Sequence, residues 1–203
     1  MSMKKVLLVL AIILAMSSVA MAAPLTNLEK GESAAGYLYW NPKADVSGLD
    51  LGNSKANGFY VETAVSDKVI IGLETIKGNH STYLAGYKFK VDTRFTDITV
   101  QYKVDDAFRL IAGNRNYDTS ASFASVSYEG SGNEFFYGIG ASTKLGDKTT
   151  AYATVTNSSI ATEFQIGANH SINENLMLNI NYRNYDEDDA SLKGIGAGVI
   201  YKF

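Results

Sequence analysis

The sequence predicts an all-β fold in which antiparallel strands, joined one after the next, close into a single up-and-down barrel. After residue 57, apolar and polar residues alternate with a period of two, which is the repeat of a strand with one apolar face. The polar face carries many glycines, whereas the solvent side of a soluble sheet favours threonine and charged residues. Tight turns alternate with longer polar loops, as in barrels that cross a membrane. Such a sheet must close, because backbone groups at an open edge have no partners in hydrocarbon.

The first 22 residues are predicted to be an export leader. Two lysines precede an apolar run at 6–16, and Ala-Met-Ala at 20–22 matches the small-residue pattern of a cleavage site. The apolar run is shorter than the roughly 20 residues that a membrane-spanning helix needs. We therefore expect a cleaved signal peptide at 1–22 and a mature chain that begins at Ala23.

The composition excludes several classes of function. The chain of 203 residues contains no cysteine, which rules out disulfides and thiolate chemistry. Its formal net charge is −3, and removal of 1–22, which holds two lysines and no other charged residue, makes it −5. A chain with this charge is not a broadly basic nucleic-acid binder. The part after the leader, about 180 residues, is enough for one domain.

The first predicted strand spans 33–41. Its tyrosines share one parity with apolar Leu38 and Trp40 on the other, so the alternation does not tell which face points outward. The interval 42–57 is rich in aspartate, glycine and asparagine, and we expect it to form a loop.

From 57 to 104 the alternation is regular. A Ser66-Asp67 turn joins two strands into a hairpin. In the strand predicted at 82–91, Lys88 and Lys90 lie opposite the apolar face. The apolar faces expected here are, in chain order, Phe59, Val61, Thr63 and Val65; Val69, Ile71, Leu73 and Thr75; Tyr83, Ala85, Tyr87, Phe89 and Val91; and Ile98, Val100, Tyr102 and Val104.

Beyond 104 the same pattern continues to the end of the chain, with a weaker strand at 119–128. Tight turns are expected at Asp105-Asp106, Gly146-Asp147 and Asn173-Glu174. The apolar faces expected here are Phe108, Leu110 and Ala112; Phe135, Tyr137, Ile139 and Ala141; Thr162, Phe164, Ile166 and Ala168; and Leu176, Leu178, Ile180 and Tyr182.

The alternation predicts twelve strands, an even number that places both ends of the domain on one side of a membrane. One turn argues for ten strands instead. Asp105-Asp106 resembles the other tight turns, yet a twelve-strand barrel places it at the opposite end. If it shares their end, 82–91 and 119–128 belong to loops and the count is ten. The twelve predicted strands span 33–41, 57–66, 68–77, 82–91, 95–104, 107–116, 119–128, 134–145, 149–156, 160–170, 175–184 and 191–203.

The last strand carries a recognisable ending. Its outer face runs through Ile195 and Ala197 to Val199, Tyr201 and Phe203, so the chain terminates on an aromatic residue. This ending resembles the closing strand of bacterial outer-membrane β-barrels, whose terminal phenylalanine is read by the assembly machinery. The resemblance implies a Gram-negative outer-membrane location, contact with outer-membrane lipid and lipopolysaccharide, and recognition by the barrel-assembly machinery through Val199, Tyr201 and Phe203. Residues 23–32 would then be a short periplasmic lead, and 33–203 the barrel domain.

The predicted inward faces carry more cations than anions. A lumen lined in this way would attract small anions. In architecture and charge it resembles small monomeric porins that pass acidic sugars. The residues expected to line the lumen are Lys88, Lys90, Lys103, Arg109, Arg115, Lys144, Arg183, Glu62, Glu74 and Glu163.

Two functions follow from this lining. The first is a narrow passive channel for small solutes, anions included. The alternative is a structural or surface-interaction barrel, adhesin-like, whose lumen is plugged by basic side chains paired with glutamate and asparagine. The assignment of faces also predicts that Ile139→Arg impairs membrane insertion, whereas Gly140→Ser is tolerated.

We expect no enzyme, no cofactor and no metal site. His80 and His170 each stand beside a serine, but neighbours in a strand point to opposite faces and make poor catalytic partners. Two histidines without cysteine also make a weak metal site. A lipid-modifying enzyme would need a serine and a histidine on the same face, within hydrogen-bond reach.

Overall fold

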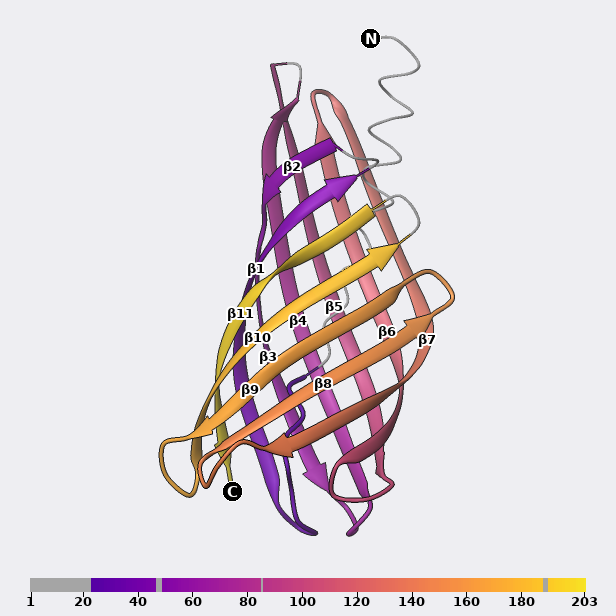
Figure 1. Ribbon diagram of the computed structural model, residues 1–203. Coiled ribbons are helices and arrows are strands. Elements are labelled where there is room, and N and C mark those ends of the chain that lie inside the picture. The colour runs from indigo at the N-terminus through magenta and orange to yellow at the C-terminus, as the bar shows by residue number, and fades with distance from the viewer. Residues whose placement is uncertain (1–22, 47–48, 85, 188–189) are drawn as a thin grey trace.

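A computed structural model describes residues 23–46, 49–84, 86–187 and 190–203, and the predicted signal peptide at 1–22 lies outside them. In the described residues, eleven strands form one antiparallel sheet in which β11 also pairs with β1, so the sheet closes into a barrel (Figure 1). No helix in this part of the chain is long and apolar enough to cross a membrane. The strands are β1 (Ser33–Val46), β2 (Leu49–Asn53), β3 (Lys55–Ala64), β4 (Val69–Leu84), β5 (Tyr87–Lys103), β6 (Phe108–Phe123), β7 (Val126–Lys144), β8 (Thr149–Ser158), β9 (Thr162–Ser171), β10 (Leu176–Glu187) and β11 (Ala190–Lys202).

Ten of these eleven strands form the ring, in the order β1, β3, β4 and so on to β11. The short β2 pairs with the end of β1 and is the additional strand. The predicted antiparallel barrel is therefore confirmed, with the alternative count of ten strands, and the count of twelve is wrong. The interval 42–57 is also not a loop, because β1 continues to Val46 and β2 and β3 occupy most of the remainder.

The two extra strands were expected where hairpins are long. Segment 82–91 spans the connection between β4 and β5, which stay paired up to Leu84 and Tyr87. Segment 119–128 spans the connection between β6 and β7, which stay paired up to Phe123 and Val126. Both segments are therefore tips of long hairpins rather than separate strands or loops.

The four predicted tight turns lie at one end of the barrel, which we call the turn end. Ser66-Asp67, Asp105-Asp106, Gly146-Asp147 and Asn173-Glu174 connect strands there, and the C-terminal Phe203 lies at the same end (Figure 1). Short polar side chains close these turns: for example, Asp105 Oδ1 accepts hydrogen bonds of 2.8 Å from two following backbone N–H groups. The opposite end, where the long hairpins finish, is called the tip end.

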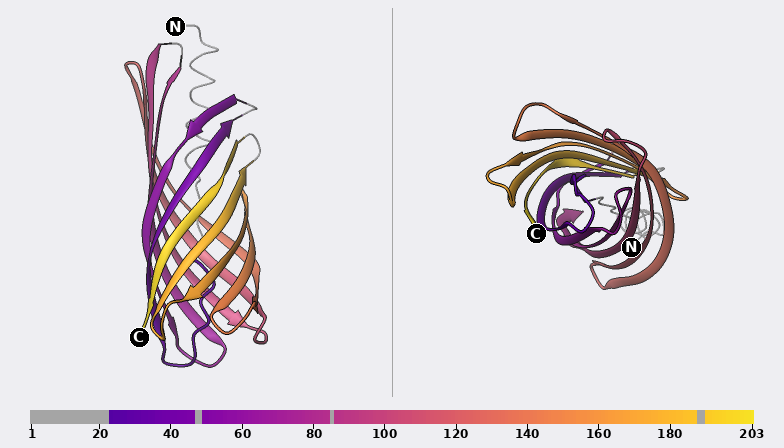
Figure 2. Two further views of the ribbon diagram at one scale, coloured as in Figure 1. Left: turned by 60° about the vertical axis from the view of Figure 1, so that its left-hand side comes forward. Right: turned by 90° about the horizontal axis from the view of Figure 1, so that it is seen from below.

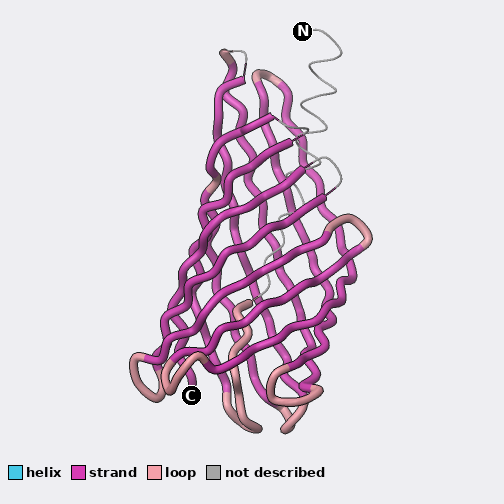
Figure 3. The backbone as a smooth tube through the Cα atoms, in the orientation of Figure 1, coloured by secondary structure: helices cyan, strands magenta, loops and turns pink. Residues whose placement is uncertain are grey.

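The barrel wall is uneven in height. The strands β4 to β7 contain 16, 17, 16 and 19 residues, whereas β8 and β9 contain 10 each. The long strands therefore project beyond the rest of the wall at the tip end (Figures 1 and 2), and almost the whole described chain is strand (Figure 3). We call the projecting part of β4 to β7 the tip sheet. It consists of the ends of two hairpins, β4–β5 on either side of the connection between Leu84 and Tyr87, and β6–β7 on either side of the connection between Phe123 and Val126.

The outward faces carry a continuous set of exposed apolar residues, called the apolar belt. Ile139, for example, is 59% exposed, while Gly140 beside it is buried. The faces of β1 are now assigned, because Leu38 and Trp40 are buried inside. The belt includes Tyr37, Tyr39, Phe59, Ile71, Leu73, Ile98, Val100, Tyr102, Phe108, Leu110, Phe135, Tyr137, Ile139, Phe164, Ile166, Leu178, Ile180, Tyr182, Ile195, Val199, Tyr201 and Phe203.

Candidate functional site: the barrel interior

Inward glycines make room for aromatic rings. A Cβ atom added to Gly36 would lie 2.2 Å from the ring of Tyr60, and one added to Gly113 would lie 2.3 Å from the ring of Phe136. Such separations are far below van der Waals contact, so each ring occupies the space that a side chain would need. The glycine-rich face predicted from the sequence is real, but aromatic rings from neighbouring strands fill the space beside Gly36 and Gly113.

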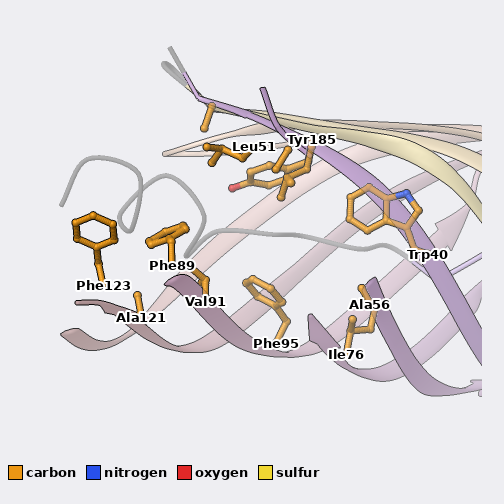
Figure 4. Close-up of a cluster of buried hydrophobic side chains, with 13 residues drawn as sticks. Trp40, Leu51, Ala56, Ile76, Phe89, Val91, Phe95, Ala121, Phe123 and Tyr185 are labelled. Carbon is orange, nitrogen blue, oxygen red and sulfur yellow. The ribbon is translucent and has the colours of Figure 1, made fainter. Parts of the chain in front are cut away.

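The interior at the tip end is an apolar core (Figure 4). Trp40, Leu51 and Tyr185 come from one side of the barrel and face Phe89 and Phe95 from the other. Trp40 is fully buried and donates a hydrogen bond of 3.0 Å from Nε1 to the carbonyl of Gly194. A packed apolar layer of this kind has the character of a soluble protein core.

The middle of the interior is a network of charged groups centred on Arg115. Its guanidinium donates to both carboxylate oxygens of Asp97, at 2.9 and 2.5 Å. It also lies 3.6 Å from Glu134 and, across the lumen from β6 to β9, 4.0 Å from Glu163. The rings of Phe95 and Phe136 lie 5.7 and 5.1 Å from the guanidinium carbon, within range for cation–π attraction.

This layer also follows from strand register. Glu74, Asp97, Arg115 and Glu134 are successive partners across β4, β5, β6 and β7, so they stand in one row on the inner wall. All four are buried, as is Arg183 on β10. Carboxylates therefore outnumber guanidinium groups in this layer, which is the reverse of the cationic lining that the sequence predicted.

The turn end of the interior is filled by the segment 24–28, called the N-terminal plug. Leu25, Thr26 and Leu28 are 0–2% exposed. Arg109 donates from Nη1 to the Thr26 carbonyl at 2.9 Å and from Nη2 to Asn27 Oδ1 at 3.1 Å. The predicted periplasmic lead therefore lies in part inside the barrel.

Further contacts hold the plug on other sides. Asn169 of β9 donates to the Leu25 carbonyl at 2.9 Å, and Lys103 of β5 donates to the Leu28 carbonyl. A Cβ atom on Gly140 of β7 would lie 2.7 Å from Leu25 Cδ1. Backbone groups of the plug are thus satisfied by inward side chains from several strands, as buried backbone requires.

The predicted lumen residues divide into three groups. Arg109, Arg115, Arg183, Glu62, Glu74 and Glu163 are buried in the interior, and Lys103 is partly buried beside the plug. Lys144 ends β7 and is exposed at the turn end. The structure brings Arg115 and Glu163 together in one network, and Glu62 and Arg109 both contact Gln101, at 2.7 and 3.0 Å.

Lys88 and Lys90 are not in the lumen. Phe89 and Val91, which alternate with them, are 0% and 2% exposed, so the lysines point outward and Lys90 pairs with Asp92. In the tip sheet the polarity of the two faces is inverted: the apolar residues face the interior core and the polar ones face solvent. The sequence prediction assumed that apolar residues face outward along the whole of each strand, which holds in the apolar belt but not in the tip sheet.

One serine and one histidine do meet inside the barrel. Ser54 Oγ lies 2.9 Å from His80 Nδ1, and both residues are buried. The adjoining cavity is about 20 Å³, room for about one water molecule rather than an acyl chain. Among the described residues, no carboxylate hydrogen-bonds to this histidine. The pair therefore lacks the orienting acid and the substrate space of a hydrolase.

Sequence reasoning missed two parts of the interior. Asp97 lies in a polar stretch and only the strand register reveals that it faces Arg115. The plug gave a weaker signal: Leu25 and Leu28 are the apolar residues of an otherwise polar segment. No group of three or more histidine, cysteine, aspartate or glutamate side chains in the described residues is arranged to hold a metal ion.

The closed barrel is similar to several solved structures. The translocator domain of the autotransporter NalP from Neisseria meningitidis matches with a TM-score of 0.60 and 10% identity, over 87% of this chain and 90% of that one. The β domain of the Bordetella autotransporter BrkA matches with a TM-score of 0.57 and 12% identity, over 86% of this chain and all of that one. Ail, the attachment invasion locus protein of Yersinia pestis, matches with a TM-score of 0.51 and 12% identity, over 86% of this chain and 99% of that one.

At these low sequence identities, the structural similarity shows a shared fold and not a shared function. No family model matches the sequence, and no curated protein matches it. The chain has the fold of the small bacterial outer-membrane β-barrels, as the closing strand predicted.

Proposed function

We propose that this protein is an outer-membrane β-barrel with a closed interior, which acts through its projecting surface rather than as a channel. The observation that carries the proposal is the filling of the lumen at three levels. An apolar core fills the tip end, the Arg115 network fills the middle, and the N-terminal plug fills the turn end. The surface-interaction alternative of the sequence thus has more support than the channel.

The membrane location is supported by the apolar belt. Large residues such as Phe59, Ile139 and Ile180 are about 60% exposed and lie on outward faces around the ring. Soluble proteins rarely expose contiguous apolar surface on this scale. Aromatic residues such as Tyr37, Tyr201 and Phe203 lie within the belt, as in the girdles of membrane barrels.

The surface role is supported by the tip sheet. β7 pairs with β6 from Val126 onward, but with β8 only from Phe136. In the described residues, the stretch 126–135 therefore has no strand on its β8 side. Such an edge presents free backbone donors and acceptors, which a second protein can use by adding a strand.

The shared fold does not discriminate between a channel and a surface-interaction role. Autotransporter translocator domains and an attachment invasion protein share it with this chain. We propose no catalytic activity, because the Ser54 and His80 pair lacks an orienting acid. The channel alternative requires the apolar core, the Arg115 network and the plug all to move aside.

Liposome swelling tests the closed interior. The mature protein is reconstituted into liposomes, which are diluted into isotonic solutions of small neutral and acidic sugars. We expect swelling rates equal to those of protein-free liposomes. Rapid swelling with the mature protein would overturn the proposal and support the channel function instead. A variant that lacks 24–28 shows whether the plug alone seals the barrel, and the Arg115 layer predicts that it stays closed.

A further inference from the structure

The outer wall of β4 and β5 changes from apolar to cationic over a short distance. Leu73 and Ile98 are cross-strand partners in the apolar belt, and Lys77 and Arg94 are partners four residues farther toward the tip. Four residues of strand span about 13 Å, or about 10 Å along the membrane normal at the usual barrel tilt. The two cations therefore lie at the depth of lipid head groups if the belt lies in the hydrocarbon.

Lys77 and Arg94 form an unfavourable pair. They are directly opposite each other on the outer face, and like charges in that position destabilise a sheet. Both are exposed. Arg94 also has Asp118 of β6 as its cross-strand partner on the other side, and Asp92, which lines the same groove, is paired with Lys90. In the described part of the chain, however, no carboxylate lies within ion-pair distance of Lys77 or Arg94. An anion placed between them would relieve the repulsion and gain two charge-assisted hydrogen bonds.

The pair lies at one side of a groove of about 720 Å³ on the tip sheet. This volume is within the range of small-molecule sites. The β6 and β7 side of the groove presents acceptors and hydroxyl groups rather than cations. The outward side chains used in the argument are Lys77, Asn79, Arg94, Asp118, Ser120 and Glu129.

We propose that this groove binds the phosphorylated sugar head group of an outer-leaflet glycolipid. The phosphate lies between Lys77 and Arg94, and the carboxylates of Asp118 and Glu129 accept hydrogen bonds from sugar hydroxyl groups. The proposal rests on the proposed membrane location. The mixture of cations and acceptors fits a phosphosugar better than a polyanion, which Asp118 and Glu129 would repel, or an acyl chain, which the polar lining excludes.

The opposite wall supplies a matched control. Lys43 of β1 and Lys193 of β11 are also cross-strand partners on the outer face, two residues beyond Ile195 of the belt. Lys43, however, is neutralised by Asp50 at 2.6 Å. Replacing this pair removes the same charge from the same kind of position but leaves the groove intact.

The test compares Lys77→Gln/Arg94→Gln with Lys43→Gln/Lys193→Gln and the unchanged protein. Each is refolded into phosphatidylcholine nanodiscs, and binding is titrated with lipid A, dephosphorylated lipid A, phosphatidylglycerol and inorganic phosphate. We expect lipid A to bind the unchanged protein and to bind the groove variant about thirtyfold more weakly, as expected for two cations lost at a membrane surface. The control variant should bind it within about threefold of the unchanged protein.

Several results would overturn the proposal. Equal weakening in both double variants would indicate general electrostatics rather than a groove. Equal affinity for lipid A and dephosphorylated lipid A would show that the phosphate is not recognised. Equal affinity for lipid A and phosphatidylglycerol would show that the sugar is not recognised. Equal saturation by inorganic phosphate would indicate a free-anion site. Failure of the protein to insert into bilayers at all would instead contradict the proposed location, whereas insertion without lipid discrimination would contradict only this site.

Discussion

Arg115 is the central residue of the charged network in the barrel interior. It is buried, pairs with Asp97 on the neighbouring strand and reaches Glu163 across the lumen. Removing one partner of a buried ion pair leaves the other charge desolvated and unpaired, which costs far more than the pair itself contributes.

We therefore predict that Arg115→Met destabilises the folded barrel by about 3–5 kcal/mol. Urea unfolding in detergent micelles measures the change. Lys55→Met, on the exposed face of β3, is the control and should alter the free energy of unfolding by less than about 0.5 kcal/mol. Equal effects of the two substitutions would mean that the Arg115 network contributes nothing to the fold.

Ile139 tests which face meets lipid. Its side chain is exposed on the outer wall of β7, within the apolar belt. Ile139→Arg should reduce the free energy of insertion by about 2–4 kcal/mol. Ser127→Arg, on the same strand in the tip sheet, should cost less than about 1 kcal/mol. Folding yield into liposomes compares them, and a comparable loss with Ser127→Arg would mean that the apolar belt is misplaced.

Gly140→Ser is no longer a suitable neutral control. The added Cβ atom would lie 2.7 Å from Leu25 Cδ1, so the leucine of the plug must shift to admit it. The alternation correctly placed Gly140 inside the barrel. It could not show that a segment more than a hundred residues earlier in the chain occupies the space beside it, because that contact depends on the closed ring.

At the scale of elements, the plug and the tip sheet are two features of this barrel that the sequence analysis did not predict. The chain turns out of the interior at Gly31, whose backbone φ of +87° is a left-handed conformation that favours glycine. Its N–H donates to the carbonyl of Ala64 at 2.8 Å, and the Ser33 N–H donates to the Phe203 carbonyl at 2.8 Å. These bonds anchor the exit of the plug to the turn end of the wall.

The absence of cysteine makes the plug directly testable. In single-cysteine variants, we predict that Leu28→Cys in the folded protein does not react with a membrane-impermeant maleimide, because the native side chain is only 1% exposed. Asp147→Cys, in an exposed turn at the same end, should react quickly. Both should react in denaturant. Rapid labelling of the folded Leu28→Cys variant would place the plug outside the barrel.

Glu32 links Glu29, the residue that follows the plug, to the last strand. Partial burial raises the pKa of its carboxyl, but hydrogen bonds from the Glu29 N–H at 2.7 Å and from Lys202 at 3.0 Å outweigh this and lower the pKa overall. A lowered pKa in the folded state gives stability that is present above the unfolded pKa and lost as the pH falls through the folded pKa.

We predict that Glu32→Gln costs less than about 1 kcal/mol at pH 7, because the side chain is partly exposed and its ion pair is screened. The difference from the unchanged protein should shrink as the pH falls through the lowered pKa of Glu32, because the glutamate then becomes neutral like the glutamine that replaces it. Urea unfolding at several pH values measures it. A difference that is independent of pH would mean that the Glu32 charge does not contribute.

The elements show where sequence reasoning succeeds and where it stops. Within the belt, strands such as β9 and β10 were predicted with the correct faces, because the proposed membrane on one side and the interior on the other enforce the alternation. In the tip sheet the outer face is polar, with Asp118 and Ser120 exposed, and such a stretch has the composition of a loop. The prediction therefore divided long hairpins into extra strands.

At the scale of the whole molecule, closure and interior filling have different origins. Closure follows from the alternation and from the cost of unpaired backbone in hydrocarbon, so the sequence predicted it. Filling depends on which inward side chains meet across the lumen, as Arg115 and Glu163 do, and on where 24–28 lies. Counting charges on the predicted inward faces shows neither the contacts across the lumen nor the position of 24–28. The sequence prediction therefore favoured a cationic channel.

Single-channel recording in planar bilayers tests the closed interior most directly. The mature protein, inserted at low density in potassium chloride, should add no discrete conductance steps over a range of applied voltages. A porin of known conductance serves as the positive control for the bilayers. Reproducible, anion-preferring steps from the unchanged protein would contradict the account, because ions cannot pass an interior that is filled as described.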